Sequence, residues 1–158
     1  KVPNRILMTA NELLEPLEQM LGQYPEAVVV WAHLGQLRYP HKQTRYSPAY
    51  VGRLLQTYRN LYFDLAVSRP GKVYPGSGVV DNALQDPSGH LIHAWKEVIE
   101  RYPDRFLIGS DIAGDRYWFL EEKVRRARDL LAVLSERTAE QIAYQNAWYL
   151  ITGTKWVE

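Results

Sequence analysis

Two short apolar runs without polar alternation constrain the fold of this chain more than any other feature. One covers residues 28–32 and stops at His33, and the other covers residues 106–108 and leads to Asp111. Such runs predict strands buried on both faces, which are typical of parallel sheets covered by helices. The carboxyl ends of parallel strands share one edge of the sheet, where α/β folds place their sites. We therefore expect His33 and Asp111, which can each bind a metal or transfer a proton, to lie at that edge.

Helical patterns and turn residues alternate with these strands, which indicates an α/β fold built from βα units. Thr9 and Glu12 have capping-box spacing ahead of an apolar helical stripe that ends at Gly22. Pro16 interrupts this stripe, so the helix either kinks there or begins near Glu15 with the proline in its first turn.

Similar signals place the elements that follow. Ser47 and a proline after it predict the start of a second helix, and residues 61–65 read as another strand. The sequence thus predicts three strands, or four if residues 5–8 form one. A last helix is expected to start at Thr138, in capping-box spacing with the glutamine three residues later, and to stop near Gly153.

Residues 67–89 are rich in glycine and proline and read as a long loop, which in compact domains is often a binding segment. Ser88 or Gly89 is expected to cap a third helix. A fourth helix is predicted over about residues 116–134. Its buried stripe is expected to consist of Leu120, Val124, Ala127, Leu131 and Leu134.

Composition excludes several classes of function. The chain of 158 residues is expected to form a single domain over residues 1–158, and its formal charge of +1 gives no case for nucleic acid or an acidic membrane surface. The basic segment 123–128 is interpreted as a solvated helix face. There are no cysteines, which excludes disulfides, thiolate metal sites and cysteine nucleophiles. No apolar run approaches the ~20 residues that span a bilayer. We expect a soluble, cytoplasmic protein that acts on a small molecule.

Four motifs in order resemble a known family. They are AHLGQ at residues 32–36, NLYFDLA at 60–66, PDRFLIGSDI at 103–112 and TAEQIAYQNAWYLI at 138–151. Together they resemble the carboxyl-terminal half of the amidohydrolase superfamily, in the amidohydrolase-related branch that includes metal-dependent hydrolases and nonoxidative decarboxylases. The resemblance runs from about residue 13 to residue 151.

The resemblance implies a (β/α)8 barrel, of which this chain would be the carboxyl-terminal portion. It implies that His33 is a ligand of a divalent metal, zinc or manganese, and that Asp111 lies at the metal and acts as the acid/base. It further implies that the Asn146-Ala147 pair is a closing structural motif. Asp64 matches an aspartate of less uniform role, and a structural role is favoured for it.

A site of this type would hydrolyse an amide, ester or lactone. A divalent metal lowers the pKa of a bound water from 15.7 to about 7, and an adjacent aspartate can take the proton. Decarboxylation of a carboxylated substrate is the neighbouring possibility. Arg69 could anchor a substrate carboxylate and His41 could touch the substrate, although surface roles remain the alternative for both. His90 and His93 are spaced for joint ligation, but surface roles are favoured.

The sequence also departs from the family pattern. It contains no His-x-His pair, and His33 with Asp111 makes two ligands where a catalytic zinc site uses three. Three or four strands fall short of the eight of a closed barrel. Ile112-Ala113-Gly114 follows Asp111 where many relatives have an aromatic residue and a proline. The alternative is therefore a non-catalytic half barrel, which self-associates as a homo-oligomer or needs a partner chain or a missing amino-terminal half.

Overall fold

A four-stranded parallel sheet forms the centre of the molecule. The computed structural model describes residues 6–9, 14–35, 46–66, 71–73, 78, 80–81 and 84–157. Its main sheet has the sequential order β1-β2-β3-β6, and every neighbouring pair is parallel. The strands are β1 (Ile6–Thr9), β2 (Val28–Trp31), β3 (Leu61–Asp64) and β6 (Phe106–Leu107). The predicted α/β class is confirmed, and these four strands form one open sheet.

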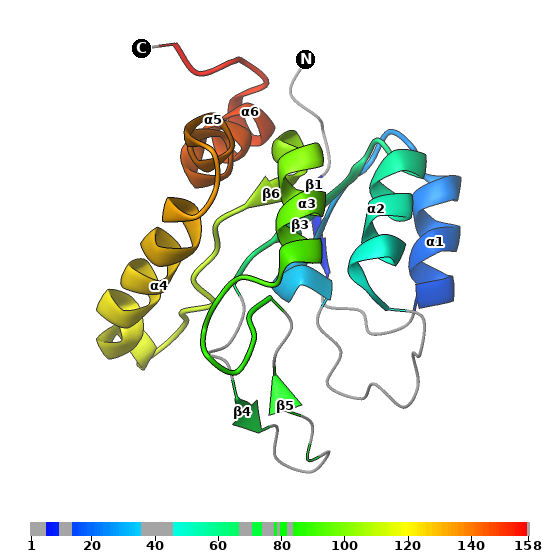
Figure 1. The fold of residues 1–158 in the computed structure, drawn as a ribbon. Helices are drawn as coiled ribbons and strands as arrows, with labels where there is room; N and C mark the ends of the chain where they lie inside the picture. The colour runs from blue at the N-terminus through cyan, green and yellow to red at the C-terminus, as the bar shows by residue number, and fades with distance from the viewer. Residues whose placement is uncertain are drawn as a thin grey trace.

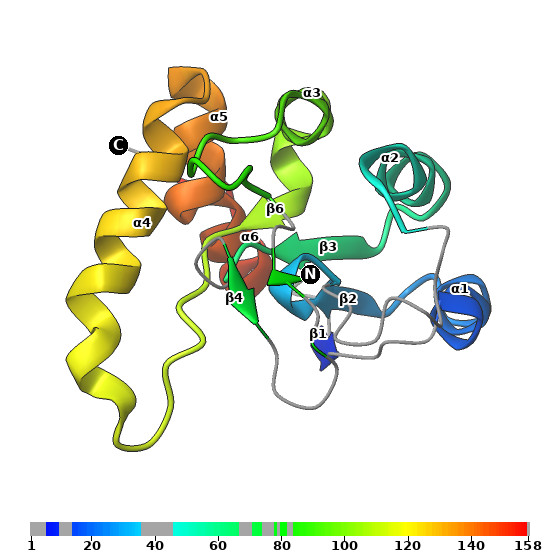
Figure 2. The same ribbon diagram turned by 60° about the horizontal axis from the view of Figure 1, so that its bottom comes forward.

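Three helices cover one face of this sheet, and the carboxyl-terminal helices lie beside its β6 end (Figures 1 and 2). The first group comprises α1 (Leu14–Gln23), α2 (Pro48–Thr57) and α3 (His93–Arg101). The second group comprises α4 (Leu120–Ala132), α5 (Glu136–Glu140) and α6 (Asn146–Thr152), with a π-helical segment, Gln141–Gln145, between the last two. Short 3-10 segments cover Ala32–Gly35, Pro103–Arg105 and Arg116–Phe119. No helix in the described ranges is long and apolar enough to cross a bilayer.

Both faces of the sheet are apolar, which explains the runs without polar alternation. On the helix-covered face Trp31, Phe63 and Phe106 are buried, with ring centroids 5.6 Å apart for the first pair and 5.8 Å for the second. On the other face Val30 and Leu107 pack with Leu150 of α6. Burial on both sides gives a continuous apolar strand, as expected for a parallel sheet.

The first half of the chain follows the predicted elements closely. Residues 6–9 form the possible fourth strand. Pro16 lies in the first turn of α1, where a missing backbone N–H costs no hydrogen bond. The alternative in which the helix begins near Glu15, with the proline in its first turn, is therefore confirmed. The capping role of Thr9 was wrong, because Thr9 ends β1 and pairs with Trp31. Ser47 caps α2 as predicted, and its Oγ accepts from the backbone N–H of Tyr50 at 3.2 Å.

The second half departs more from expectation. The segment between Ala66 and α3 contains a short antiparallel pair, β4 (Lys72–Val73) and β5 (Val80–Asp81). Helix α3 begins at His93 and not near residue 88. The reason is local: the Asp86 carboxylate accepts backbone hydrogen bonds from Ser88 and His90, which holds these residues in a turn.

The predicted buried stripe of α4 was also partly wrong. Leu120 and Val124 are 47% and 39% exposed, whereas Leu130 is buried. Leu131 packs partly against the core. The helix therefore contacts the core mainly through its carboxyl-terminal half, and its first turns project from the rest of the molecule (Figure 2).

The start of the last helical segment is set by a contact that the sequence does not reveal. Helix α5 is preceded by Ser135 and not by Thr138, which is buried inside the helix. The Glu100 carboxylate accepts from the Ser135 backbone N–H at 2.6 Å, from the Ser135 hydroxyl at 2.7 Å and from the Thr138 hydroxyl at 2.6 Å. A carboxylate from α3 thus caps α5 across 35 residues of sequence.

This cap makes stability depend on pH. Burial raises the pKa of Glu100, but hydrogen bonds from Thr138 and Ser135 outweigh it and leave the pKa below its ordinary value of 4.5. A lowered folded-state pKa contributes stability above the unfolded value, which is lost as pH falls through the folded value. We expect Glu100→Gln to be less stable than the parent at pH 7 and the difference to shrink below about pH 4.

Urea unfolding of both proteins at pH 7 and pH 3 measures this. Glu26→Gln, at an exposed position, is the matched control. A difference between Glu100→Gln and the parent that stays constant over this range would contradict the role of the charged carboxylate.

Candidate functional site

The carboxyl ends of β2 and β6 bring together the two residues that the sequence singled out. His33 Nε2 lies 3.9 Å from Asp111 Oδ1. The side chain of His33 is 25% exposed and that of Asp111 is 45% exposed. The expected proximity of the two residues is thus confirmed, and both remain accessible to a small ligand.

The imidazole of His33 is held in a defined orientation. Its Nδ1 lies 3.0 Å from the carbonyl oxygen of Ala66. A carbonyl only accepts hydrogen bonds, so Nδ1 carries the hydrogen and donates it. In the neutral ring this leaves Nε2, which faces Asp111, with a lone pair. Histidines that bind metals are commonly oriented by such a bond from the opposite ring nitrogen.

Asp64 supports this arrangement from β3. Its side chain is only 4% exposed, and Oδ1 accepts from the backbone N–H groups of His33 at 3.0 Å and Ala66 at 2.9 Å. One buried carboxylate oxygen thus ties the ends of β2 and β3 together. The structural interpretation of Asp64 agrees with these contacts.

The backbone around His33 is held in an unusual conformation. His33 and Leu34 have φ values of 57° and 55°, and Asp111 has 51°, all in the left-handed region. For residues with a side chain this conformation costs on the order of 1–3 kcal/mol each and tends to occur at functional sites. Two hydrogen bonds hold the turn at His33 and Leu34. The His33 backbone N–H donates to Asp64 Oδ1, and the Tyr46 hydroxyl donates to the Leu34 carbonyl.

Gly35 completes the turn for two physical reasons. Its φ is +62°, and a Cβ at this position would lie 2.8 Å from the indole of Trp31. Glycine is therefore the residue that allows the chain to turn back over the end of β2.

Gly109 allows the end of β6 to approach β3. A Cβ at this position would lie 3.0 Å from Ala66 Cβ and 3.3 Å from Asp64 Oδ1. We expect Gly109→Ala to lower the free energy of unfolding by about 1–3 kcal/mol through overpacking. It should also displace Asp111 from His33.

Urea unfolding tests this expectation. Gly22→Ala in α1 is the matched control, since a Cβ there meets nothing within 4 Å. That change should stabilise the protein by about 0.5–1 kcal/mol. Equal stability of the Gly109→Ala variant and the parent would contradict the close approach.

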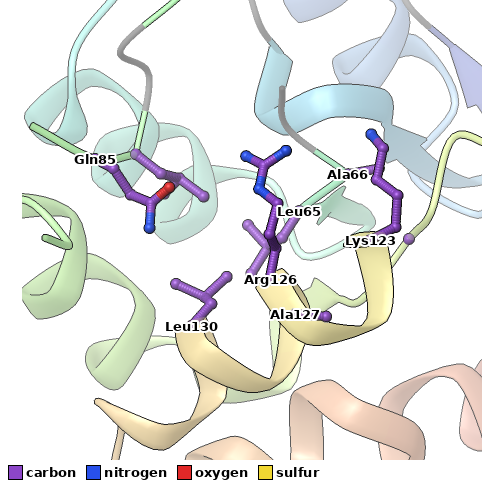
Figure 3. A pocket seen from close by; sticks show the side chains of 9 residues that line it. Leu65, Ala66, Gln85, Lys123, Arg126, Ala127 and Leu130 are labelled. Atoms are coloured by element: carbon purple, nitrogen blue, oxygen red, sulfur yellow. The ribbon is translucent and has the colours of Figure 1, made fainter. Parts of the chain in front are cut away.

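A cavity of about 270 Å³ lies next to Asp111. A smaller one of about 30 Å³ lies between α4 and the end of β3 (Figure 3). Lys123 and Arg126 line both cavities. Burial and the neighbouring Arg126 lower the pKa of Lys123, while the Asp111 carboxylate acts in the opposite direction. Sequence reasoning interpreted segment 123–128 as a solvated face. Only the i, i+3 spacing of Lys123 and Arg126 on the helix after Asp111 could have suggested that they share a site.

The residues present fit a metal site in part. The orientation of His33 suits a ligand, and Asp111 offers an oxygen close to Nε2. Within the described ranges, however, no group of three or more His, Cys, Asp or Glu side chains could hold a metal ion. The pair could therefore supply at most two ligands, one short of the three protein ligands of a catalytic zinc site.

The structure describes only two of the other sequence candidates, His90 and His93. Arg69 and His41 lie outside the described residues. His90 and His93 do not point to a shared site: His90 Nδ1 lies 3.6 Å from Asp86, and His93 Nε2 lies 3.5 Å from Glu97. Both histidines are more than 80% exposed, which fits the favoured surface role.

Comparison with known proteins gave no match, either among protein-family models or among curated proteins.

Proposed function

We propose that His33 and Asp111 are part of a divalent-metal site of an amidohydrolase-type hydrolase that acts on an amide, ester or lactone. The observation that carries this proposal is the orientation of His33. Its Nδ1 donates to a backbone carbonyl and its Nε2 faces a carboxylate 3.9 Å away. This is the arrangement of a histidine ligand with its supporting hydrogen bond.

Each residue has a defined part in this proposal. His33 would hold the metal through Nε2, and the Ala66 carbonyl fixes the ring. When bound, the metal supplies the Lewis acidity that makes water nucleophilic near neutral pH. Asp111 accepts the proton of the attacking water and returns it to the leaving group. Its exposed side chain allows that exchange. Zinc and manganese both suit a histidine and carboxylate pair.

The topology is consistent with the carboxyl-terminal part of a (β/α)8 barrel. The four strands are parallel and sequential, as in a barrel wall, and His33 and Asp111 follow their carboxyl ends. The remaining strands of a barrel and a third ligand would come from outside the described residues. Decarboxylation of a carboxylated substrate would use the same two residues.

One observation favours a second candidate, a non-catalytic half that depends on a partner chain or a further copy. Large apolar side chains are exposed, among them Trp118 at 74%, Tyr117 at 71% and Ile151 at 70%. Exposed apolar groups of this size are typical of protein–protein contacts. In this case catalysis would require the partner.

Hydrolysis assays distinguish the two candidates. The protein, loaded with zinc or manganese, would be tested on panels of esters, lactones and amides, together with His33→Ala and Asp111→Asn. His93→Ala is the matched control, since His93 is exposed and its Nε2 lies beside Glu97. We expect turnover by the parent and the control and its loss in the two site variants. No turnover by the parent would refute the enzyme proposal for this chain and favour the second candidate.

A further inference from the structure

The cavity next to Asp111 has a distinct charge. Its lining side chains carry four positive charges and two negative ones, those of Asp111 and Glu122. The cavity therefore has a net positive charge. The whole chain carries a formal charge of only +1. The net positive charge at this cavity therefore exceeds that of the chain as a whole. The cationic side chains of the cavity are Lys72, Arg116, Lys123 and Arg126.

These cations come from three segments that converge on the same space. Lys72 lies on β4, Arg116 in the 3-10 segment after Asp111, and Lys123 and Arg126 three residues apart on α4. The side chains of Lys123 and Arg126 extend in the same direction from the helix (Figure 3). Both are partly buried. Like charges that are partly withdrawn from water repel one another, and an anion placed between them relieves the repulsion.

The cavity also has an apolar wall. Ile112 and Phe119 line it beside the cations. Guanidinium groups pair bidentately with carboxylate or phosphate, and lysine adds a point charge. A small organic anion would find contacts for both its charged group and its carbon skeleton. The volume of about 270 Å³ is suited to a ligand at the small end of the usual range.

We propose that this cation-lined cavity binds the oxyanion group, carboxylate or phosphate, of a small organic molecule. Asp111 contributes to both the cavity and the His33 pair, so a ligand held by Lys123 and Arg116 would present its uncharged part to that pair. The role of the bound anion as substrate rests on the proposed function, whereas the binding itself does not.

Binding of inorganic phosphate and of glutarate to the metal-free protein at low ionic strength tests the proposal. The readout is the shift of backbone amide resonances in two-dimensional NMR. We expect saturable shifts around Ile112 and Lys123 with at least one of the two anions. Saturation by phosphate alone would assign a phosphate ligand, and saturation by glutarate alone would assign a carboxylate.

Variants separate a built site from general attraction to positive charge. Lys123→Gln and Arg116→Gln should each weaken binding by about tenfold, the loss expected for one charged hydrogen bond. Arg128→Gln removes an exposed charge from the same helix outside the cavity, and it should leave the dissociation constant within about twofold. Circular dichroism confirms that each variant is folded.

Two results would overturn the proposal: no saturable shift with either anion, or equal weakening in Arg128→Gln. Because the protein is metal-free, this outcome is independent of the metal site. Anion binding without metal binding would leave the cavity as an anion site and remove only its role in substrate recognition.

Discussion

Replacement of Arg105 by methionine is expected to lower the free energy of unfolding by about 3 kcal/mol, because it removes the charged donor from the Leu61 and Tyr58 carbonyl groups. Arg105 is 4% exposed. Its Nε donates to the Leu61 carbonyl at 2.9 Å, and its Nη2 donates to the Tyr58 carbonyl at 2.6 Å. The guanidinium also lies over the Tyr62 ring, 5.0 Å from the centroid. Arg105 thus joins the start of β6 to the start of β3.

The charge of Arg105 persists at neutral pH despite its position. Burial lowers the pKa of Arg105, while Tyr62 and Asp104 raise it. An arginine pKa starts so high that the group remains protonated. The side chain therefore keeps all its donors for the strand carbonyls.

Urea unfolding followed by tryptophan fluorescence measures the loss. Arg128→Met, at an exposed position on α4, should change the free energy of unfolding by no more than about 0.5 kcal/mol. A loss in Arg105→Met no larger than that of this control would show that the buried hydrogen bonds contribute little.

Asp64→Ala is expected to have a similar effect at the other end of β3, about 2–4 kcal/mol. Oδ1 accepts from two backbone N–H groups, those of His33 and Ala66, and alanine would leave both without an acceptor. The left-handed turn at His33 would lose one of its restraints. His33 should then lose its alignment with Asp111 even in molecules that remain folded.

Asp64→Asn is the informative control, because its side chain keeps one carbonyl oxygen that can accept the same two bonds. Amide hydrogen exchange at His33 and Ala66 reports the contact directly. We expect fast exchange in Asp64→Ala and slower exchange in Asp64→Asn. Unchanged protection in Asp64→Ala would contradict the proposed support of the turn.

The sequence predicted the parallel sheet well because its strands are buried on both faces. The continuous runs that end at Trp31 and Leu107 are the direct result of two apolar surfaces, one toward the helices and one toward Leu150. Helix α2 was also predictable, since Ser47 caps it through a local hydrogen bond from the Tyr50 backbone N–H. Such features depend on neighbours within a few residues.

Helix starts that depend on distant contacts were not predictable. Thr138 has capping-box spacing, but Glu100 caps the helix earlier, at Ser135. Thr9 has the same spacing, but pairing with Trp31 in the sheet takes precedence. In both cases a tertiary contact overrides a local pattern.

In the candidate site, too, one part was predictable from the sequence and another depends on tertiary contacts. The proximity of His33 and Asp111 followed from parallel strands, because residues after two carboxyl ends meet at one edge. The cations on α4 could not be predicted to face Asp111, because that depends on how the helix returns to the sheet. Two residues of its predicted apolar stripe, Leu120 and Val124, are exposed for the same reason.

The divalent metal content of the purified, undialysed protein, measured by elemental mass spectrometry, tests the proposed metal site most directly. His33→Ala serves as the site variant and His93→Ala as the matched control. We expect about one zinc or manganese ion per chain in the parent and the control, and its loss in His33→Ala. Metal in the parent at the level of His33→Ala would contradict the assignment of His33 and Asp111 as ligands in this chain.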